Sequence, residues 1–253
     1  MRQDFSEGAS GSDYPPLVLL HGIFGKPTDW SECARYFDGS CEVFAPRLPL
    51  EDADRTQHTL DHVVSFVTGF LDNHGIDRVI LGGNSLGGHI ALHVALRCPA
   101  RVAGLILAGS SGLFERGYER NIPRHPDRAW LKEKMREVFF DEAFVTETLV
   151  DEIRDILADR RRIAALVRIA ASAKRDNMRE LLHEISAPVL LVWGKNDEIT
   201  PPSVAHEFKE RLPHAELEFI EQCGHAPILE KPQEFNRIVE RFLQRHFVPL
   251  HAG

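Results

Sequence analysis

One stretch of the chain constrains the fold more than any other, because an apolar run, a glycine-rich turn and an apolar helix follow one another directly. The run Val79–Leu81 leads into the turn GGNSLGG, and a helix is predicted over Leu86–Leu96. A serine on such a turn is exposed, and the helix aims its first backbone N–H groups at the same place. Side chains at positions 83 and 87 would clash there, which explains both glycines. The pattern indicates Ser85 as a nucleophile; a serine that only caps the helix is the alternative.

Short apolar runs alternate with longer amphipathic stretches along most of the chain. This alternation is typical of an α/β fold in which crossover helices flank a mostly parallel sheet. About six strands are predicted, at Leu17–Leu20, Glu42–Ala45, Val79–Leu81, Leu105–Ala108, Val189–Trp193 and Glu216–Ile220. Further helices are expected at about Asp29–Phe37, Leu60–Asn73, Ser203–Leu212 and Pro232–Arg245. Thr59 is the expected N-cap of the second of these, and Gly75 its stop.

The alternation is interrupted once, over residues 112–186, where the periodicity is helical and no strand is evident. We interpret this region as a helical lid inserted into a core made of residues 1–111 and 187–253. Its charged residues fit a solvated helix surface.

A second loop is expected to complete the site for the reacting oxygen. The strand Leu17–Leu20 runs into HGIFG, residues 21–25. Acyl transfer through a tetrahedral intermediate needs two fixed N–H donors. The backbone of Leu86 supplies one, and we assign the other to Phe24, with Ile23 as the less favoured choice. His21 is interpreted as structural.

An acid and a base follow two later strands. Asp197 lies in the loop after Val189–Trp193, and His225 lies in the loop after Glu216–Ile220. Ligands of parallel sheets bind at this carboxyl edge. A carboxylate there can orient the imidazole, whose other nitrogen takes the serine proton. Glu198 is the nearest rival to Asp197.

Together these motifs resemble the α/β-hydrolase superfamily over almost the whole chain. The strongest likeness is to lid-bearing bacterial serine hydrolases, which are grouped with small carboxylesterases and meta-cleavage-product hydrolases. The resemblance implies the order Ser, Asp, His for the triad and a roof over the active site formed by residues 112–186. Those carbon–carbon hydrolases usually carry a tryptophan directly after the histidine, whereas this chain has Ala226 and Pro227.

The side chains of the substrate pocket are harder to assign. There are five candidates. Four are apolar and would suit an acyl group, Ile23, Phe139, Phe140 and Phe144, and Arg168 could bind a substrate carboxylate through two hydrogen bonds. Apolar residues at helical spacing more often form the lid's own core, and an arginine more often faces solvent.

Composition excludes several functional classes. The 253-residue chain has a net charge of −8, which argues against nucleic acid and anionic membranes as partners. No secretory signal or membrane-length apolar stretch is evident, so a cytoplasmic location is expected. The four cysteines are interpreted as reduced thiols, and no metal or organic cofactor is indicated. A small-molecule substrate is expected, and the oligomeric state is left open.

The preferred interpretation is hydrolysis of a small or medium carboxylic ester through an acyl-enzyme. A carbon–carbon bond hydrolase of the meta-cleavage-product type, or a related lyase, is one alternative. A ligand receptor that keeps the fold without turnover is another, because this scaffold serves several functions.

Overall fold

The structure is a computed structural model that describes residues 13–51, 59–114 and 126–247. Its centre is a sheet of six parallel strands in the order β2-β1-β3-β4-β5-β6. The strands are β1 Leu17–Leu20, β2 Val43–Phe44, β3 Val79–Asn84, β4 Val102–Ala108, β5 Val189–Gly194 and β6 Ala215–Ile220. The predicted α/β architecture is therefore confirmed.

Helices occupy the connections between these strands. The α-helices are α1 Ser31–Tyr36, α2 Leu60–Asn73, α3 Leu86–Arg97, α4 Arg128–Arg136, α5 Glu147–Ala158, α6 Arg160–Arg175, α7 Pro202–Arg211, α8 Pro227–Glu230 and α9 Pro232–His246. Short 3-10 turns are η1 Pro27–Trp30, η2 Pro99–Arg101, η3 Glu142–Phe144 and η4 Leu182–Glu184.

Strand and helix ends depart from the predicted ones where side-chain periodicity carries no signal. β3 runs on to Asn84 because glycines 82 and 83 still pair with β4, although glycine is a poor strand former. The helix expected over Asp29–Phe37 is split into η1 and α1. α2 has the predicted bounds, with Thr59 Oγ1 accepting from the His62 N–H at 3.1 Å.

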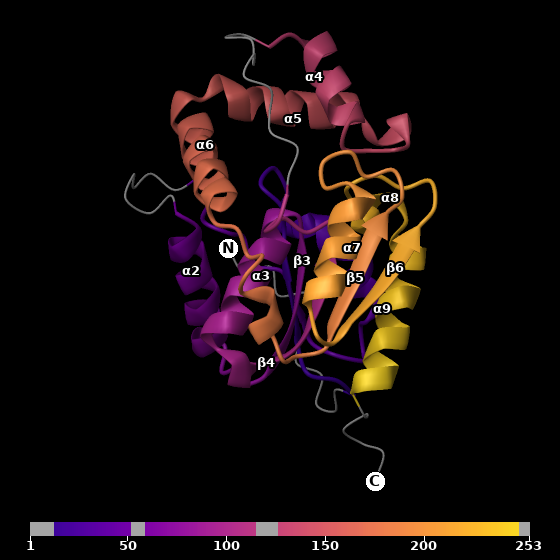
Figure 1. Cartoon of the computed structure of the whole chain (residues 1–253). Coiled ribbons are helices and arrows are strands. Elements are labelled where there is room, and N and C mark those ends of the chain that lie inside the picture. Colours follow the sequence, from indigo (N-terminus) through magenta and orange to yellow (C-terminus); the bar gives the residue numbers. More distant parts are fainter. Residues whose placement is uncertain (1–12, 52–58, 115–125, 248–253) are drawn as a thin grey trace.

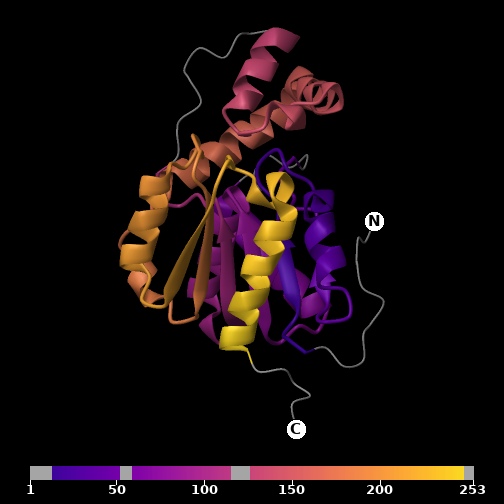
Figure 2. The same ribbon diagram turned by 90° about the vertical axis from the view of Figure 1, so that its right-hand side faces the viewer.

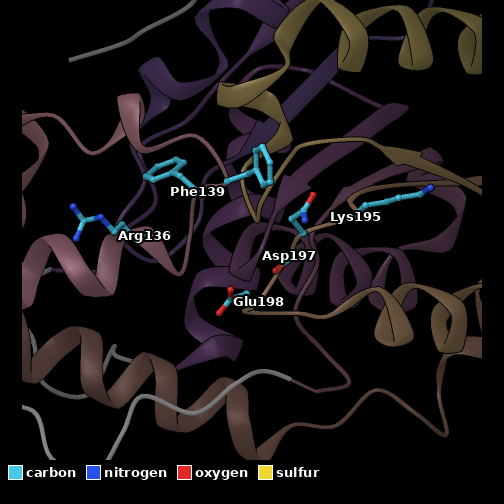
Figure 3. Close-up of a pocket in the computed structure, with 7 residues that line it drawn as sticks. Arg136, Phe139, Lys195, Asp197 and Glu198 are labelled. Carbon is cyan, nitrogen blue, oxygen red and sulfur yellow. The ribbon is translucent and has the colours of Figure 1, made fainter.

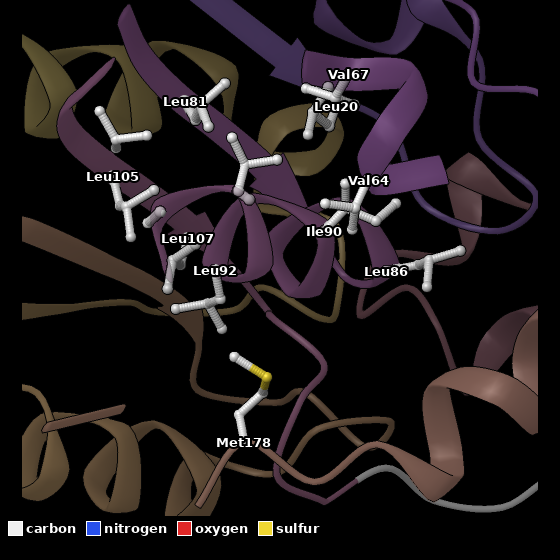
Figure 4. Packing of buried hydrophobic residues seen from close by; sticks show 14 of the residues in the cluster. Leu20, Val64, Val67, Leu81, Leu86, Ile90, Leu92, Leu105, Leu107 and Met178 are labelled. Carbon is white, nitrogen blue, oxygen red and sulfur yellow. The ribbon is translucent and has the colours of Figure 1, made fainter. Parts of the chain in front are cut away.

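The sheet is buried on both faces, which is why its strands read as continuous apolar runs. Because side chains alternate along a strand, Val18 and Leu20 pack with α2, α3 and α7, whereas Leu17 and Leu19 pack with α1 and α9. Figures 1 and 2 show these helices covering the two faces. Figure 4 shows the first cluster, in which Leu81, Leu105 and Leu107 of the sheet meet Ile90 of α3.

Between β4 and β5 the described residues contain helices and no strand, as predicted for residues 112–186. We call residues 126–175, which carry α4, η3, α5 and α6, the helical segment. Figure 1 shows α4 and α5 beyond the edge of the sheet at which the strands end. The expected boundary at 186 differs from the packing, because Met178, Leu182 and Ile185 are buried in the main core.

Candidate active site

The turn that carries Ser85 is strained and tightly packed. β3 ends at Asn84 and α3 begins at Leu86, which leaves Ser85 between them with φ 55° and ψ −119°. A side chain on Gly87 would place its Cβ 2.1 Å from the Leu20 carbonyl oxygen, and one on Gly83 would lie 2.2 Å from the Gly87 carbonyl carbon. The predicted need for glycine at both positions is confirmed. Such backbone strain is typical of functional sites.

Asp197 and His225 lie in contact at the same edge of the sheet. Their loops follow β5 and β6, and the His225 Nδ1–Asp197 Oδ2 distance is 2.9 Å. The Asp197 side chain is fully buried, and that of His225 is 8% exposed. A buried carboxylate that accepts from Nδ1 fixes the imidazole so that Nε2 is the basic nitrogen. Glu198, the rival acid, is exposed.

Three further donors hold the Asp197 carboxylate in place. Oδ1 accepts from the backbone N–H groups of Ile199 and Thr200, both at 2.9 Å, and Oδ2 accepts from Thr200 Oγ1 at 2.9 Å. Thr200 Oγ1 also lies 3.3 Å from His225 Nδ1. Sequence reasoning missed Thr200, although an aspartate followed three residues later by threonine is a recognisable turn pattern.

Asn84 connects the nucleophile turn to the histidine loop, and this role was also missed. Its side-chain amide donates to the Ala108 carbonyl at 2.9 Å and to the His225 carbonyl at 3.0 Å. Gly109, with φ +49°, lies so close that a Cβ there would be 3.0 Å from His225 Nδ1. The residue directly before Ser85 is therefore hydrogen-bonded to the loop of His225. Its Oγ is 3.5 Å from Ser111 Oγ.

The loop assigned to the oxyanion folds against Ser85. Gly25 N–H donates to the Gly22 carbonyl at 3.1 Å, and a Cβ on Gly22 would lie 3.4 Å from the Ser85 Cβ. Phe24 is partly buried against the main core. At the other side of the turn, Leu86 N–H belongs to the first turn of α3, whose N–H groups an α-helix leaves without intrahelical acceptors.

His21 holds the loop of residues 21–25 in place through contacts of both ring nitrogens. Its Nδ1 lies 2.8 Å from the Gly22 carbonyl, and Leu48 N–H donates to its Nε2 at 3.1 Å. Burial lowers the pKa of His21 to about 4. A neutral ring that donates through Nδ1 and accepts through Nε2 matches both contacts. This agrees with the structural role expected for His21.

A cavity of about 430 Å³ lies beside the acid loop. It is lined by Arg136, Phe139, Phe140, Lys195, Asn196, Asp197 and Glu198. Figure 3 shows Arg136 and Phe139 on one side of this cavity and the loop that carries Lys195, Asp197 and Glu198 on the other.

The predicted pocket residues differ in where they lie. Phe139 and Phe140 line the cavity, and Phe139 stacks on Phe144 with ring centroids 5.8 Å apart. Ile23 is packed against the main core, and Arg168 is exposed on α6. Contact of Ile23, Phe144 and Arg168 with a substrate stays a prediction.

A buried carboxylate joins the helical segment to the histidine loop. Glu230 of α8 accepts from Gly224 N–H at 2.8 Å through Oε1, and from Phe140 N–H at 2.8 Å through Oε2. His225 N–H donates to the Val138 carbonyl at 2.7 Å. Burial raises the pKa of Glu230, although the backbone donors oppose this effect. Nothing in the sequence around Glu230 predicted this connection.

The four cysteines are not among the proposed catalytic residues. All four are unpaired thiols, as expected. Burial raises the pKa of Cys223, the thiol nearest the base, so it is a poor nucleophile.

A comparison with known protein families identifies the family to which this fold belongs. The model of the alpha/beta hydrolase family matches residues 17–238. The chain belongs to the alpha/beta hydrolase family. This match covers the strands, the Ser85 turn and the loops of Asp197 and His225.

The curated proteins to which this chain is similar include two kinds of hydrolase. A 2-hydroxy-6-oxononadienedioate/2-hydroxy-6-oxononatrienedioate hydrolase of Burkholderia vietnamiensis is 29% identical, over 97% of this chain and 92% of its own. A pimeloyl-[acyl-carrier protein] methyl ester esterase of Nitrosomonas europaea is 29% identical, over 87% of this chain and 92% of its own.

Among solved structures, the alpha/beta hydrolase MGS-MChE2, from a lagoon-sediment metagenome, is 33% identical with a TM-score of 0.74, and 93% of each chain is covered. Within the described residues of our chain, no helix has the length and apolar character needed to cross a membrane.

Proposed function

We propose that this family member is a serine hydrolase that cleaves a small or medium carboxylic ester through an acyl-enzyme. The observation that carries the proposal is the 2.9 Å contact between Asp197 Oδ2 and His225 Nδ1 beside the strained Ser85 turn. A serine hydroxyl becomes a nucleophile only when a base accepts its proton. Here the base is oriented by a carboxylate that itself holds three further hydrogen bonds.

The reaction follows from these roles. Ser85 Oγ attacks the ester carbonyl carbon while His225 Nε2 takes the hydroxyl proton. Asp197 accepts from Nδ1 and stabilises the imidazolium. The tetrahedral intermediate then collapses, the alcohol leaves with the proton from His225, and an acyl-enzyme remains. Water activated by His225 attacks the acyl carbon, the Ser85–acyl bond breaks, and the carboxylic acid is released.

The backbone N–H groups of Leu86 and Phe24 are proposed to stabilise the oxyanion. The first-turn position of Leu86 and the approach of Gly22 to Ser85 support this assignment. Donors fixed by a helix and a turn need no reorganisation during reaction, and losing one such donor typically costs about 10²–10³ in kcat.

The helical segment is proposed to serve as a lid that shapes the substrate site. Phe139 and Phe140 on one side and Asp197 on the other line the same cavity, which supports this role. An apolar acyl group would pack on the aromatic side. The buried contacts of Glu230 make the lid continuous with the histidine loop.

A carbon–carbon bond hydrolase is the second candidate, and the Burkholderia relative favours it. Such a substrate would carry a carboxylate and need a cationic partner. Arg168, the predicted clamp, is exposed on α6 rather than lining the cavity. Arg136 and Lys195, which do line the cavity, are the cations that a substrate carboxylate could meet there.

Turnover of p-nitrophenyl acetate, butyrate and octanoate tests the proposal. We expect Ser85→Ala to lose activity by on the order of 10³-fold or more. Ser111→Ala is the matched control, since it removes the hydroxyl 3.5 Å away and should keep most activity. Ester activity that survives Ser85→Ala would contradict the nucleophile. Turnover of a vinylogous diketo acid without ester turnover would overturn the substrate class.

A further inference from the structure

Three side chains with metal-ligating atoms converge where the nucleophile helix meets the end of α6. His89 and His93 lie one turn apart on α3, and Asp176 follows the last residue of α6. His93 Nε2 is 3.0 Å from Asp176 Oδ1, and His89 Nε2 is 3.6 Å from the same oxygen. The candidate ligand atoms of all three residues lie within 4.8 Å of one another.

This spacing fits a small divalent ion. Two histidines at i and i+4 on one helix face are a recurrent zinc-binding pair. With zinc–ligand bonds of about 2.0–2.1 Å, neighbouring ligands of a tetrahedral site lie about 3.3 Å apart. The observed separations of 3.0 and 3.6 Å from the Asp176 oxygen bracket that value. The two imidazole rings lie close together, with centroids 5.1 Å apart and an interplanar angle of 32°.

The burial of His89 points independently to a ligand. Its side chain has no exposed area, and neither ring nitrogen has a hydrogen-bond partner within the described part of the chain. An unpaired buried polar group costs about 1–3 kcal/mol. Coordination of Nε2 would satisfy one of these nitrogens.

Asp176, the third candidate ligand, is held in place and can be reached by an ion from solvent. Met178 N–H donates to the Gly112 carbonyl at 2.8 Å, which fixes the chain just beyond Asp176. The side chains of Asp176 and His93 are 39% and 18% exposed, so an ion can arrive from their side. The ion pairs of Asp176 within the described residues are with the two histidines and with no lysine or arginine.

We propose that His89, His93 and Asp176 form a binding site for Zn²⁺ or a similar borderline divalent ion. Two imidazoles and one carboxylate provide three ligands, and water completes the tetrahedron. The ion would tie α3, which begins directly after Ser85, to the end of α6. The bound ion would cross-link the helix that follows Ser85 to the helical segment. Its role would be structural, and it would take no part in ester cleavage.

Zinc binding to the metal-stripped full-length protein tests this site. Equilibrium dialysis with metal analysis should give one Zn²⁺ per wild-type chain. His93→Gln and Asp176→Asn should each weaken binding by more than the roughly 10–100-fold typical of outer-sphere changes. Co²⁺ should give the intense visible absorption of a tetrahedral complex in the wild type and not in the two variants. Zn²⁺ should raise the Tm of the wild type and leave that of Asp176→Asn unchanged.

Two controls separate this site from other histidines. His246→Gln removes an exposed histidine that pairs with the carboxylate of Glu216 and has no second imidazole beside it among the residues that the structure describes. His225→Gln removes the proposed catalytic base. Both should keep full zinc binding. The proposal is overturned if the wild type takes up no zinc, if zinc loss follows His225, or if Asp176→Asn binds zinc as tightly as the wild type. Asp176 is partly exposed, so its variant should fold even if a histidine variant does not.

Discussion

The sheet with its flanking helices and the helical segment are stabilised in different ways. The two main clusters bury dozens of apolar side chains on both faces of the sheet, whereas the segment's own cluster has three fully packed members, Leu131, Met135 and Val150. The segment is joined to the rest by apolar side chains of α6 that are buried in the main core, Leu166, Ile169 and Ala173, and by polar contacts such as Glu230 with Phe140. The core therefore fixes the candidate catalytic groups, and α4 and α5, which form only the small cluster, can change with less loss of stability.

The largest effect is expected from the most crowded backbone contact of the core. Gly87→Ala would force a Cβ against the Leu20 carbonyl oxygen, 2.1 Å away. We expect a loss of about 3 kcal/mol or more in the free energy of unfolding, at the upper end for overpacked sites. Gly69→Ala in α2 is the control, because its Cβ meets nothing within 4 Å and should add about 0.5–1 kcal/mol. Urea unfolding measures both, and equal effects would contradict this comparison.

Protonation of His21 at acid pH should lower the free energy of unfolding. Its pKa is about 4 in the folded protein against 6.5 when unfolded, so the unfolded chain binds the proton more tightly. Stability is therefore lost as pH falls from about 6.5 through 4, by up to about 3 kcal/mol from this group.

The comparison of wild type with His21→Asn isolates this term. The variant loses the acceptor for Leu48 N–H at every pH, but its unfolding free energy should change less between pH 7 and pH 4. Denaturant unfolding at both pH values gives the difference. Parallel pH profiles for the two proteins would rule out His21 as the titrating group.

A smaller effect is expected where the segment meets the histidine loop. In Glu230→Gln an amide replaces one carboxylate oxygen, so backbone N–H groups of either Gly224 or Phe140 lose an acceptor. We expect a loss of about 1–3 kcal/mol, and faster hydrogen exchange at residues 138–141. Glu234→Gln, an exposed change at the start of α9, is the matched control. Unchanged exchange at 138–141 would show that Glu230 does not hold the segment.

Sequence reasoning succeeded where one signal is repeated along the chain. Apolar runs located the six strands, and the strand-end positions of Asp197 and His225 indicated that they would meet. It failed where a contact depends on tertiary approach alone. Glu230 lies on a short helix that carries no periodicity, and one of its donors, the Phe140 N–H, is 90 residues away in sequence. Asn84 was missed because its side chain bonds to the carbonyl of His225, which is 141 residues away. Thr200 is different, because its partner Asp197 is only three residues away and the contact is local.

The ion pair between Arg162 and Glu51 should give the smallest effect. Arg162 Nε and Nη2 donate to the two Glu51 oxygens at 2.8 and 3.1 Å, which is a bidentate geometry, but the side chains are 34% and 24% exposed. Solvent and salt screen such a pair, so a double-mutant cycle of Arg162→Gln and Glu51→Gln should give a coupling below about 1 kcal/mol that falls further in high salt. Because the pair joins the start of α6 to the loop after β2, the hydrogen exchange of α6 should respond more than the global unfolding free energy. A coupling of several kcal/mol would mean that the segment and the core unfold as one unit, against the difference in packing between them.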